Sequence, residues 1–457
     1  MGAALAAGLI ATILISVLAR AAGSDPGPAY PPLVWSAAAV LLVVGLLALF
    51  VRRIDIRLGG GFPWLIGVIS LVAAVVPWWA VAEGNPILGE AIYRGLRVPQ
   101  GIVQFWDLSL VMQSVDCARF GFDVYVDNNG CMQDASIYAP GTLWLQYVPG
   151  SVFSQESVTV LGVIMMVITS LVLVWLARQS SGIGQIVLGV AALGAPWMLL
   201  LERGNIDAVL LWSAAITVIL VRRWNALWAW SLAAALVWLM GTWKYYPFVM
   251  GLMLIPVLRL RRGWMVIAGF LVASAVFVIL TWENVLFSLD SNSAMINLDD
   301  YVVLGRVPVV ARMWGGDPGI WQGADLLVAA LAVVALVWGI GVGLASGVRR
   351  PWLSMLAVAG ASIYLVSVLV AGFGWGYKAV FLLLTVPLVS RLVSSRIRVL
   401  LASGVAVLAL IGVQSVVVWN TVLATSAGLI AASFSAGVAG VVLWRSIREV
   451  SPSRPLV

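Results

Sequence analysis

The stretch WSLAAALVWLMGTWKYYPFVMGLMLIPVLRL, residues 230–260, joins two apolar runs through one short polar turn. This pattern recurs along a chain that is 62% hydrophobic and only 10% charged, with a mean hydropathy of +1.06. A soluble domain cannot cover its surface with so little charge. Backbone polar groups in lipid must be satisfied within a helix or a closed barrel, and these runs do not alternate as barrel strands do. The sequence therefore predicts an all-α polytopic membrane protein.

Turns and charges divide the apolar sequence into about fourteen predicted spans within a single membrane domain, residues 1–457. The first segment, MGAALAAGLIATILISVLARAA, has no basic residue ahead of its apolar stretch. We therefore interpret it as the first span and not as a cleaved signal peptide. The predicted spans are centred near Ile13, Leu42, Ile69, Ile168, Val190, Ala215, Ala234, Leu254, Ala275, Val333, Ile363, Leu383, Val407 and Ile430.

Arginine sets the predicted orientation. When the spans alternate, most arginines fall in short connections on one side, together with only two acids, Asp55 and Glu449. This bias marks the cytoplasmic side, so both termini are expected in the cytoplasm. The use of arginine over lysine and the richness in Ala, Val and Gly suggest a bacterium, and hence a bacterial plasma-membrane protein. Topology thus accounts for the net charge of +7, and no nucleic-acid partner is expected. The arginines concerned are Arg52, Arg53, Arg57, Arg178, Arg222, Arg223, Arg259, Arg261, Arg262, Arg349, Arg350, Arg391, Arg396, Arg398, Arg445, Arg448 and Arg454.

Two long connections on the opposite side hold most of the polar sequence. We expect extracytoplasmic loops at residues 83–157 and 283–325, of which the first is rich in acids and contains both cysteines, Cys117 and Cys131. An oxidising compartment favours a disulfide between them, with two unpaired thiols as the alternative. The chain has no histidine, which removes histidine acid–base catalysis and histidine metal ligation.

The chain's only two lysines lie in short turns on the same side as these loops. Lys244 lies in TWKYYP and Lys378 in FGWGYK, and a third polar turn, LLERGNIDA, contains Arg203 and Asn205. Lysine beside aromatic residues at a membrane interface is a common anchor, and this explains any one turn by itself. Three such turns beside an acidic loop instead predict a site where cations bind a lipid-linked phosphate.

These motifs resemble those of the GT-C superfamily of integral-membrane glycosyltransferases. The resemblance is closest to the family 87 branch, which includes actinobacterial mannosyltransferases that use polyprenyl-phosphate-mannose. It lies in WDLSLVMQSVDCARFGFDVYV, YAPGTLWLQYVPG, ERGNIDAVLL, KYYPF and WGYKAVFLLLTVP, over roughly residues 100–390. The family usually has its aspartate loop after the first span and some members use an active-site histidine, and this chain differs in both respects.

The resemblance implies inverting transfer of a sugar, mannose or arabinose, from a polyprenyl phosphate to a lipid or polysaccharide hydroxyl at the outer membrane face. Asp107 best matches the aspartate that precedes a helix in the family, and we interpret it as the catalytic base, with Asp116 as the next choice. A solvated Asp107 that caps a helix beginning at Leu108 is the alternative. Cations that stabilise the departing phosphate are expected to be Lys244, Arg203 and Lys378. Residues that orient the substrate are expected to be Asn205, Tyr246, Tyr377 and Asp116.

The predicted partners are a polyprenyl-phosphate sugar donor, a glycolipid or glycan acceptor and membrane lipid. No cofactor is expected, although the adjacent Asp299 and Asp300 leave a divalent metal open. A transporter or flippase of lipid-linked glycans, or a ligase, is the alternative function. Charges crowd one membrane face and the span centres are apolar, which favours an enzyme over a transporter. The sequence leaves the sugar, the acceptor and the oligomeric state open.

Overall fold

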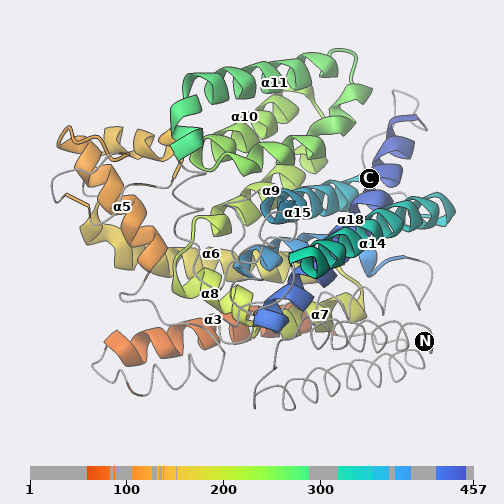
Figure 1. Ribbon diagram of the computed structural model, residues 1–457, viewed down its shortest axis with the longest axis horizontal. Helices are drawn as coiled ribbons and strands as arrows, with labels where there is room; N and C mark the ends of the chain where they lie inside the picture. The colour runs from red at the N-terminus through yellow and green to blue at the C-terminus, as the bar shows by residue number, and fades with distance from the viewer. Residues whose placement is uncertain are drawn as a thin grey trace.

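The computed structural model of the chain describes residues 59–82, 87, 105–125, 131–132, 136, 138–150, 152–287, 318–348, 350–369, 376–392 and 418–448. All regular elements within these ranges are helices, which confirms the predicted all-α class. Figure 1 shows them packed as a bundle, with α5 (Trp106–Arg119) towards the left and α14 (Pro318–Ala345) beside α18 (Val418–Arg448) towards the right.

Polar turns separate the apolar helices, and several helices begin with a proline in the first turn, where its missing N–H costs no hydrogen bond. The remaining elements in chain order are α3 (Phe62–Ala82), the 3₁₀ helices η1 (Pro140–Tyr147) and η2 (Gln155–Ser157), α6 (Val158–Gln179), α7 (Gly182–Ala191), α8 (Ala195–Glu202), α9 (Asp207–Arg223), α10 (Leu227–Trp243), the 3₁₀ helix η3 (Tyr246–Arg259), α11 (Gly263–Leu280), α15 (Pro351–Leu369), the 3₁₀ helix η4 (Gly376–Thr385) and α16 (Val386–Val389).

Five helices among the described residues are long and apolar enough to cross a membrane. These helices are α3, η2 continued by α6, α11, and the C-terminal parts of α14 and α18. The bent pair of α7 and α8 makes a sixth if it is counted as one span. Four further apolar helical stretches have only 10–17 residues: Leu227–Trp243, Tyr246–Arg259, Pro351–Ser367 within α15, and Lys378–Val389 across η4 and α16. The predicted count of fourteen spans is therefore not confirmed: several apolar helices among the described residues are shorter than a typical span, and the predicted spans near Ile13, Leu42 and Val407 lie outside those residues.

Helix ends that carry arginine contact one another. Arg391, just after α16, donates from Nε to the carbonyl of Gln179 at the end of α6 at 2.9 Å. Arg259, at the end of η3, donates to the carbonyl of Ser446 near the end of α18 at 3.3 Å. These contacts place the end of α16 beside the end of α6, and the end of η3 beside the end of α18. In a bundle whose helices alternate in direction, these ends lie on the same side.

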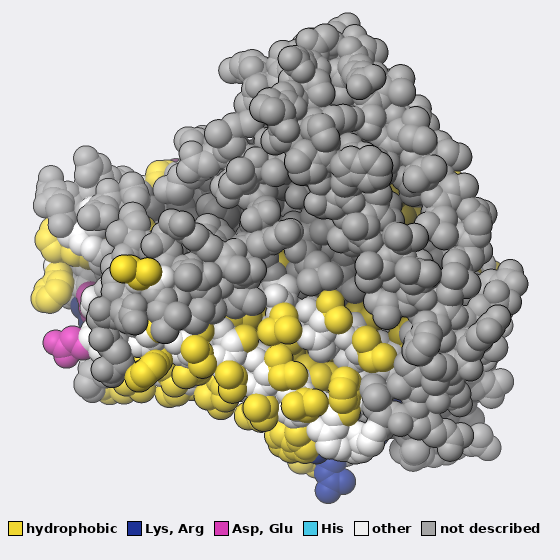
Figure 2. Space-filling view, turned by 90° about the horizontal axis from the view of Figure 1, so that it is seen from below, with side chains coloured by type: hydrophobic (Ala, Val, Ile, Leu, Met, Phe, Trp, Pro, Cys, Tyr) yellow, Lys and Arg dark blue, Asp and Glu magenta, His cyan; other side chains and the backbone are white. Residues whose placement is uncertain are grey.

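Apolar side chains fill both the interior and much of the surface. The interior contains large side chains that are almost fully buried, including Trp197, Trp230 and Phe381. On the outside of α3, Trp64 and Val68 are exposed. Figure 2 shows mainly hydrophobic side chains, with uncharged atoms between them, on the described part of one face, and its few charged side chains lie at the margins. A surface of this kind is suited to lipid, and the apolar helices support a membrane-embedded protein.

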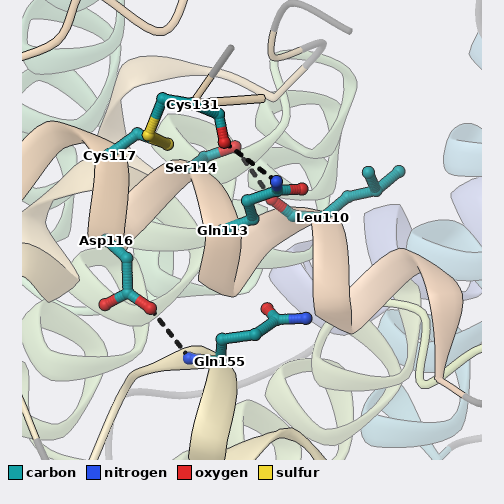
Figure 3. Close-up of a disulfide and its surroundings, with 7 residues drawn as sticks. All are labelled: Leu110, Gln113, Ser114, Asp116, Cys117, Cys131 and Gln155. Atoms are coloured by element: carbon teal, nitrogen blue, oxygen red, sulfur yellow. Dashed lines mark hydrogen bonds between the residues drawn. A yellow bond between two sulfur atoms is a disulfide. The ribbon is translucent and has the colours of Figure 1, made fainter. Parts of the chain in front are cut away.

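The described part of the first predicted loop, residues 83–157, packs against the bundle through α5, η1 and η2. Cys117 and Cys131 form a disulfide, as the sequence predicts (Figure 3). Figure 3 also shows Gln113 donating to the carbonyl of Cys131, and the Asp116 carboxylate accepting from the backbone N–H of Gln155. Contacts from α5 therefore hold both Cys131 and the entry into η2.

Arg119, in the last turn of α5, binds the segment at residues 145–153 near the end of this loop. Its guanidinium donates to the backbone carbonyls of Leu145 at 3.1 Å, Val148 at 3.0 Å and Phe153 at 2.5 Å. It also forms an ion pair with Asp116 at 2.8 Å. One planar cation thus satisfies carbonyls from η1 and from the segment that leads into η2.

Several predictions concern residues outside the described ranges. These are both termini, the spans near Ile13, Leu42 and Val407, and most of the loop at residues 283–325, with Asp299 and Asp300.

Candidate functional site

The start of α5 is bonded to the turn between α8 and α9. Phe105, the residue before the helix, has a left-handed backbone conformation with φ of 54°. Its N–H donates to the carbonyl of Glu202 at 3.1 Å, and the N–H of Asp107 donates to the carbonyl of Arg203 at 3.1 Å. These bonds satisfy N–H groups that the first turn of a helix leaves without intrahelical partners. The predicted loop therefore folds back onto the bundle at Asp107.

Two glycines make room for this contact. A Cβ on Gly162 of α6 would lie 2.5 Å from the ring of Phe105, which is itself buried. Gly204 has φ of +57°, and a Cβ there would lie 3.1 Å from the Cβ of Leu108. Glycine is favoured at Gly204 both by its left-handed conformation and by the close approach of α5.

Asp107 lies in a buried, polar environment at this junction. Its carboxylate accepts a hydrogen bond from the Asn205 side-chain amide and lies 3.5 Å from the Arg203 guanidinium. Burial raises the pKa of the Asp107 carboxyl above its usual value of 3.8, while Arg203 and Asn205 act in the opposite direction. The alternative of a solvated loop carboxylate does not describe a side chain with these contacts.

A second buried carboxylate, Asp207, holds both lysines of the chain. Lys244 Nζ lies 2.7 Å from Asp207 Oδ1, and Lys378 Nζ lies 3.2 Å from Asp207 Oδ2. The Tyr246 hydroxyl also donates to Oδ1, and its ring lies 3.6 Å from Lys378 Nζ. Three turns that are far apart in the sequence therefore meet at one carboxylate.

The Asn205 amide links the two carboxylates. Its Oδ1 accepts from Lys244 Nζ at 3.2 Å and from the backbone N–H of Asp207 at 2.9 Å. Since an ammonium and a backbone N–H can only donate, this contact fixes the amide so that Nδ2 faces Asp107. The hydrogen-bonded network thus runs from Asp107 through Asn205 to Lys244 and Asp207.

Tyr138, from the predicted loop at residues 83–157, contacts both Asp107 and Lys244. Its hydroxyl donates to the backbone carbonyl of Asp107 at 3.5 Å, and its ring lies 5.4 Å from Lys244 Nζ. The N–H of the next residue, Ala139, donates to the carbonyl of Trp243 at 3.1 Å. The loop and the turn after α10 are therefore fastened together beside Lys244.

Most of the residues singled out from the sequence meet at this place. The network contains Asp107, Arg203, Asn205, Lys244, Tyr246 and Lys378. Asp116 does not join them, because it is paired with Arg119 and accepts from the N–H of Gln155. The side chain of Tyr377 lies outside the described residues.

Asp207 and Tyr138 belong to the network although the sequence assigned neither of them a role. Asp207 was visible as the last polar residue of the ERGNID turn, but nothing in its spacing distinguishes an ion-pairing acid from a helix-capping one. Tyr138 was one aromatic residue among many. Their part in the network depends on contacts between distant segments, which a single sequence does not show.

The arrangement combines a proton acceptor with three cations in one buried place. Asp107 can accept a proton from a bound hydroxyl group, and Arg203, Lys244 and Lys378 can stabilise negative charge that develops nearby. Within the described ranges, no group of three or more Cys, Asp or Glu side chains is arranged to hold a metal ion.

No protein-family model, no curated protein and no solved structure matches the chain.

Proposed function

We propose that this protein is a membrane glycosyltransferase of the GT-C type, similar to family 87. In this proposal it transfers a sugar, mannose or arabinose, from a polyprenyl phosphate to a hydroxyl of a lipid or polysaccharide acceptor. The observation that carries the proposal is the connection of buried Asp107 through Asn205 to Lys244. One network therefore offers a base for the acceptor and cations for the donor.

The reaction requires one bond to form and one to break at the anomeric carbon. The acceptor oxygen attacks that carbon from the side opposite the phosphate, and the carbon–phosphate oxygen bond breaks, so the configuration inverts. Asp107 accepts the hydroxyl proton, and polyprenyl phosphate leaves with the bonding electrons. A base with a raised pKa is suited to this step, because proton affinity favours transfer as attack proceeds.

The cations act on the leaving phosphate. A phosphate departs without protonation, but its growing charge needs donors that are already in place. Each lysine ammonium has three N–H groups, so it can contact a phosphate oxygen while it remains paired with Asp207. Arg203 supplies a planar guanidinium next to Asp107.

The proposed location is the outer face of a bacterial plasma membrane, with both termini in the cytoplasm. The arginine-rich helix ends would then face the cytoplasm, and the network would lie at the opposite ends of the same helices. A donor carried by a lipid reaches such a place from within the bilayer. This supports polyprenyl phosphate as the sugar carrier.

The test is an assay of purified protein in lipid nanodiscs with radiolabelled polyprenyl-phosphate mannose and arabinose and a panel of glycolipid acceptors. The wild type is expected to form a glycosidic product with one donor. Asp107→Asn keeps the shape and the site for Asn205 but removes the base, and we expect it to lose activity by about a thousandfold. Retained turnover in this variant would refute the role of Asp107.

The matched control is Asp123→Asn, which changes an exposed acid on the same loop outside the network. Its turnover is expected to equal that of the wild type. Uptake of a lipid-linked glycan into vesicles without any product would instead support a transporter. A requirement for a preassembled glycan donor would support a ligase.

A further inference from the structure

Asp207 is a fully buried acid at the start of an apolar helix. A buried carboxylate is costly unless it is paired and hydrogen-bonded. Here one oxygen accepts from Lys244 and Tyr246, and the other lies 3.2 Å from Lys378. Both carboxylate oxygens are thus engaged by cations from other segments.

The two ammonium groups come from separate segments of the chain and share one carboxylate. Lys244 follows α10 and Lys378 belongs to η4, and two like charges near one another in a buried place repel. A carboxylate between them offsets this repulsion and sets the direction of each Nζ. The position of both cations therefore depends on the charge of Asp207.

The effect extends to Asp107 through one amide. Lys244 is bound both to Asp207 and to Asn205 Oδ1, and the opposite end of that amide donates to Asp107. If Lys244 moved away, Asn205 would lose one of the donors that fix its orientation. The two carboxylates are thus coupled without direct contact.

We propose that Asp207 is a positioning residue that holds Lys244 and Lys378 for the leaving phosphate and, through Asn205, orients Asp107. This inference rests on the proposed glycosyl transfer for its role in catalysis, but the ion-pair arrangement can be tested without any turnover.

The chain offers an unusually direct probe, because Lys244 and Lys378 are its only lysines. Their side chains are 12% and 5% exposed, respectively. Amine acetylation of the detergent-purified protein, followed by mass spectrometry, therefore reports on these two groups and the N-terminus alone. Slow labelling of both lysines is expected in the wild type.

In Asp207→Asn we expect several-fold faster acetylation of both lysines. Loss of the anion favours the neutral amine and releases the side chains from their ion pairs. Asp123→Asn is the matched control and should label as the wild type does. Unchanged labelling in Asp207→Asn would overturn the proposal.

A charge-balanced variant keeps the test informative if Asp207→Asn is poorly folded. Combining Asp207→Asn with Lys378→Met removes one acid and one base from the same pair. The double variant is expected to melt at a higher temperature than Asp207→Asn alone, since it leaves one buried cation, Lys244, without the carboxylate instead of two. Strictly additive effects of the two changes on the melting temperature would overturn the pairing.

Transfer assays then separate the two proposals. If the wild type transfers sugar, Asp207→Asn should lower kcat/KM by about tenfold or more through misplaced donor groups. If labelling and melting follow the expectation but no donor is used, only the proposed function fails. If transfer occurs and the labelling is unchanged, only the role of Asp207 fails.

Discussion

Asp107 and Asp207 are both buried, yet their surroundings suit different tasks. Asp107 faces one amide and one guanidinium, whereas Asp207 is held by two ammonium groups and a phenol. The ionised form of Asp207 is stabilised on both oxygens, so it is suited to fixing cations. Burial raises the pKa of the Asp107 carboxyl above that of an exposed carboxyl, which suits a proton acceptor.

The pH dependence of transfer follows from these contacts. In the proposed reaction Asp107 acts as the base when it is deprotonated, so kcat/KM should rise with pH through the raised pKa of Asp107 and be lost as the pH falls below it. Because the charge of Arg203 lowers this pKa, Arg203→Gln should move the acid limb of the profile to higher pH.

The measurement is the pH–rate profile of kcat/KM for both proteins under the same lipid conditions. A limb that stays in place, or moves to lower pH, would show that the titrating base is not the Asp107 carboxyl.

At the scale of the elements, the decisive contact is the docking of α5 on the α8–α9 turn. It uses backbone hydrogen bonds, a left-handed Phe105 and two glycines that leave space for it. The helix carries Asp107 at its docked end and Asp116 further along, about 13 Å away at 1.5 Å per residue. Only the docked end can therefore take part in the network.

Gly162→Ala should disturb this contact without changing any polar group. The new methyl would lie 2.5 Å from the Phe105 ring, and overpacking of this kind typically costs about 1–3 kcal/mol. We expect a lower melting temperature and reduced transfer. Gly269→Ala is the control, since a Cβ there meets nothing within 4 Å in α11. Equal melting temperatures for the two variants would contradict the docking of Phe105 against α6.

The disulfide lies at the end of α5 that is opposite to Asp107, in the same predicted loop. Cys117 and Cys131 enclose a short segment, and closure of a loop of this size contributes about 3 kcal/mol in the chain-entropy account. Replacing both cysteines by serine should lower the thermal midpoint and make the loop more sensitive to protease. Because Asp107 is held separately by the α8–α9 turn, some transfer should remain. Complete loss of transfer in a folded double-serine variant would contradict this independence.

At the scale of the whole molecule, opposite helix ends differ in charge. In α9, Asp207 begins the helix and Arg222 and Arg223 end it. In η3, Tyr246 lies at the network and Arg259 at the other end. Both helices thus run from the mixed-charge network to an end that carries arginine, which is the end that we propose for the cytoplasmic side.

This polarity predicts which sites are accessible from outside the cell. Both native cysteines are in the disulfide, so an introduced cysteine supplies the only thiol. A membrane-impermeant maleimide should label Tyr147→Cys, an exposed loop position, in intact cells. It should label Arg262→Cys, an exposed position before α11, only after the cells are permeabilised. The reverse pattern would invert the proposed topology.

The sequence determined the class of the molecule. With 62% hydrophobic residues and 10% charged residues, the chain can satisfy its backbone only in helices, and polar residues are left for the turns. The turns with Lys244 and Lys378 could be recognised as exceptional because lysine is otherwise absent, and the turn with Arg203 and Asn205 because it is polar between two apolar runs. The disulfide could be predicted because both cysteines fall in one loop.

Only the tertiary structure decided how these turns combine. The absence of Asp116 from the network, the pairing of both lysines with Asp207 and the bridging amide of Asn205 all depend on contacts between distant segments. Local sequence determines that the apolar segments form helices, because backbone hydrogen bonding acts within each segment. Which helix ends meet is set by side-chain packing across the whole bundle, and that packing is a property of no single segment.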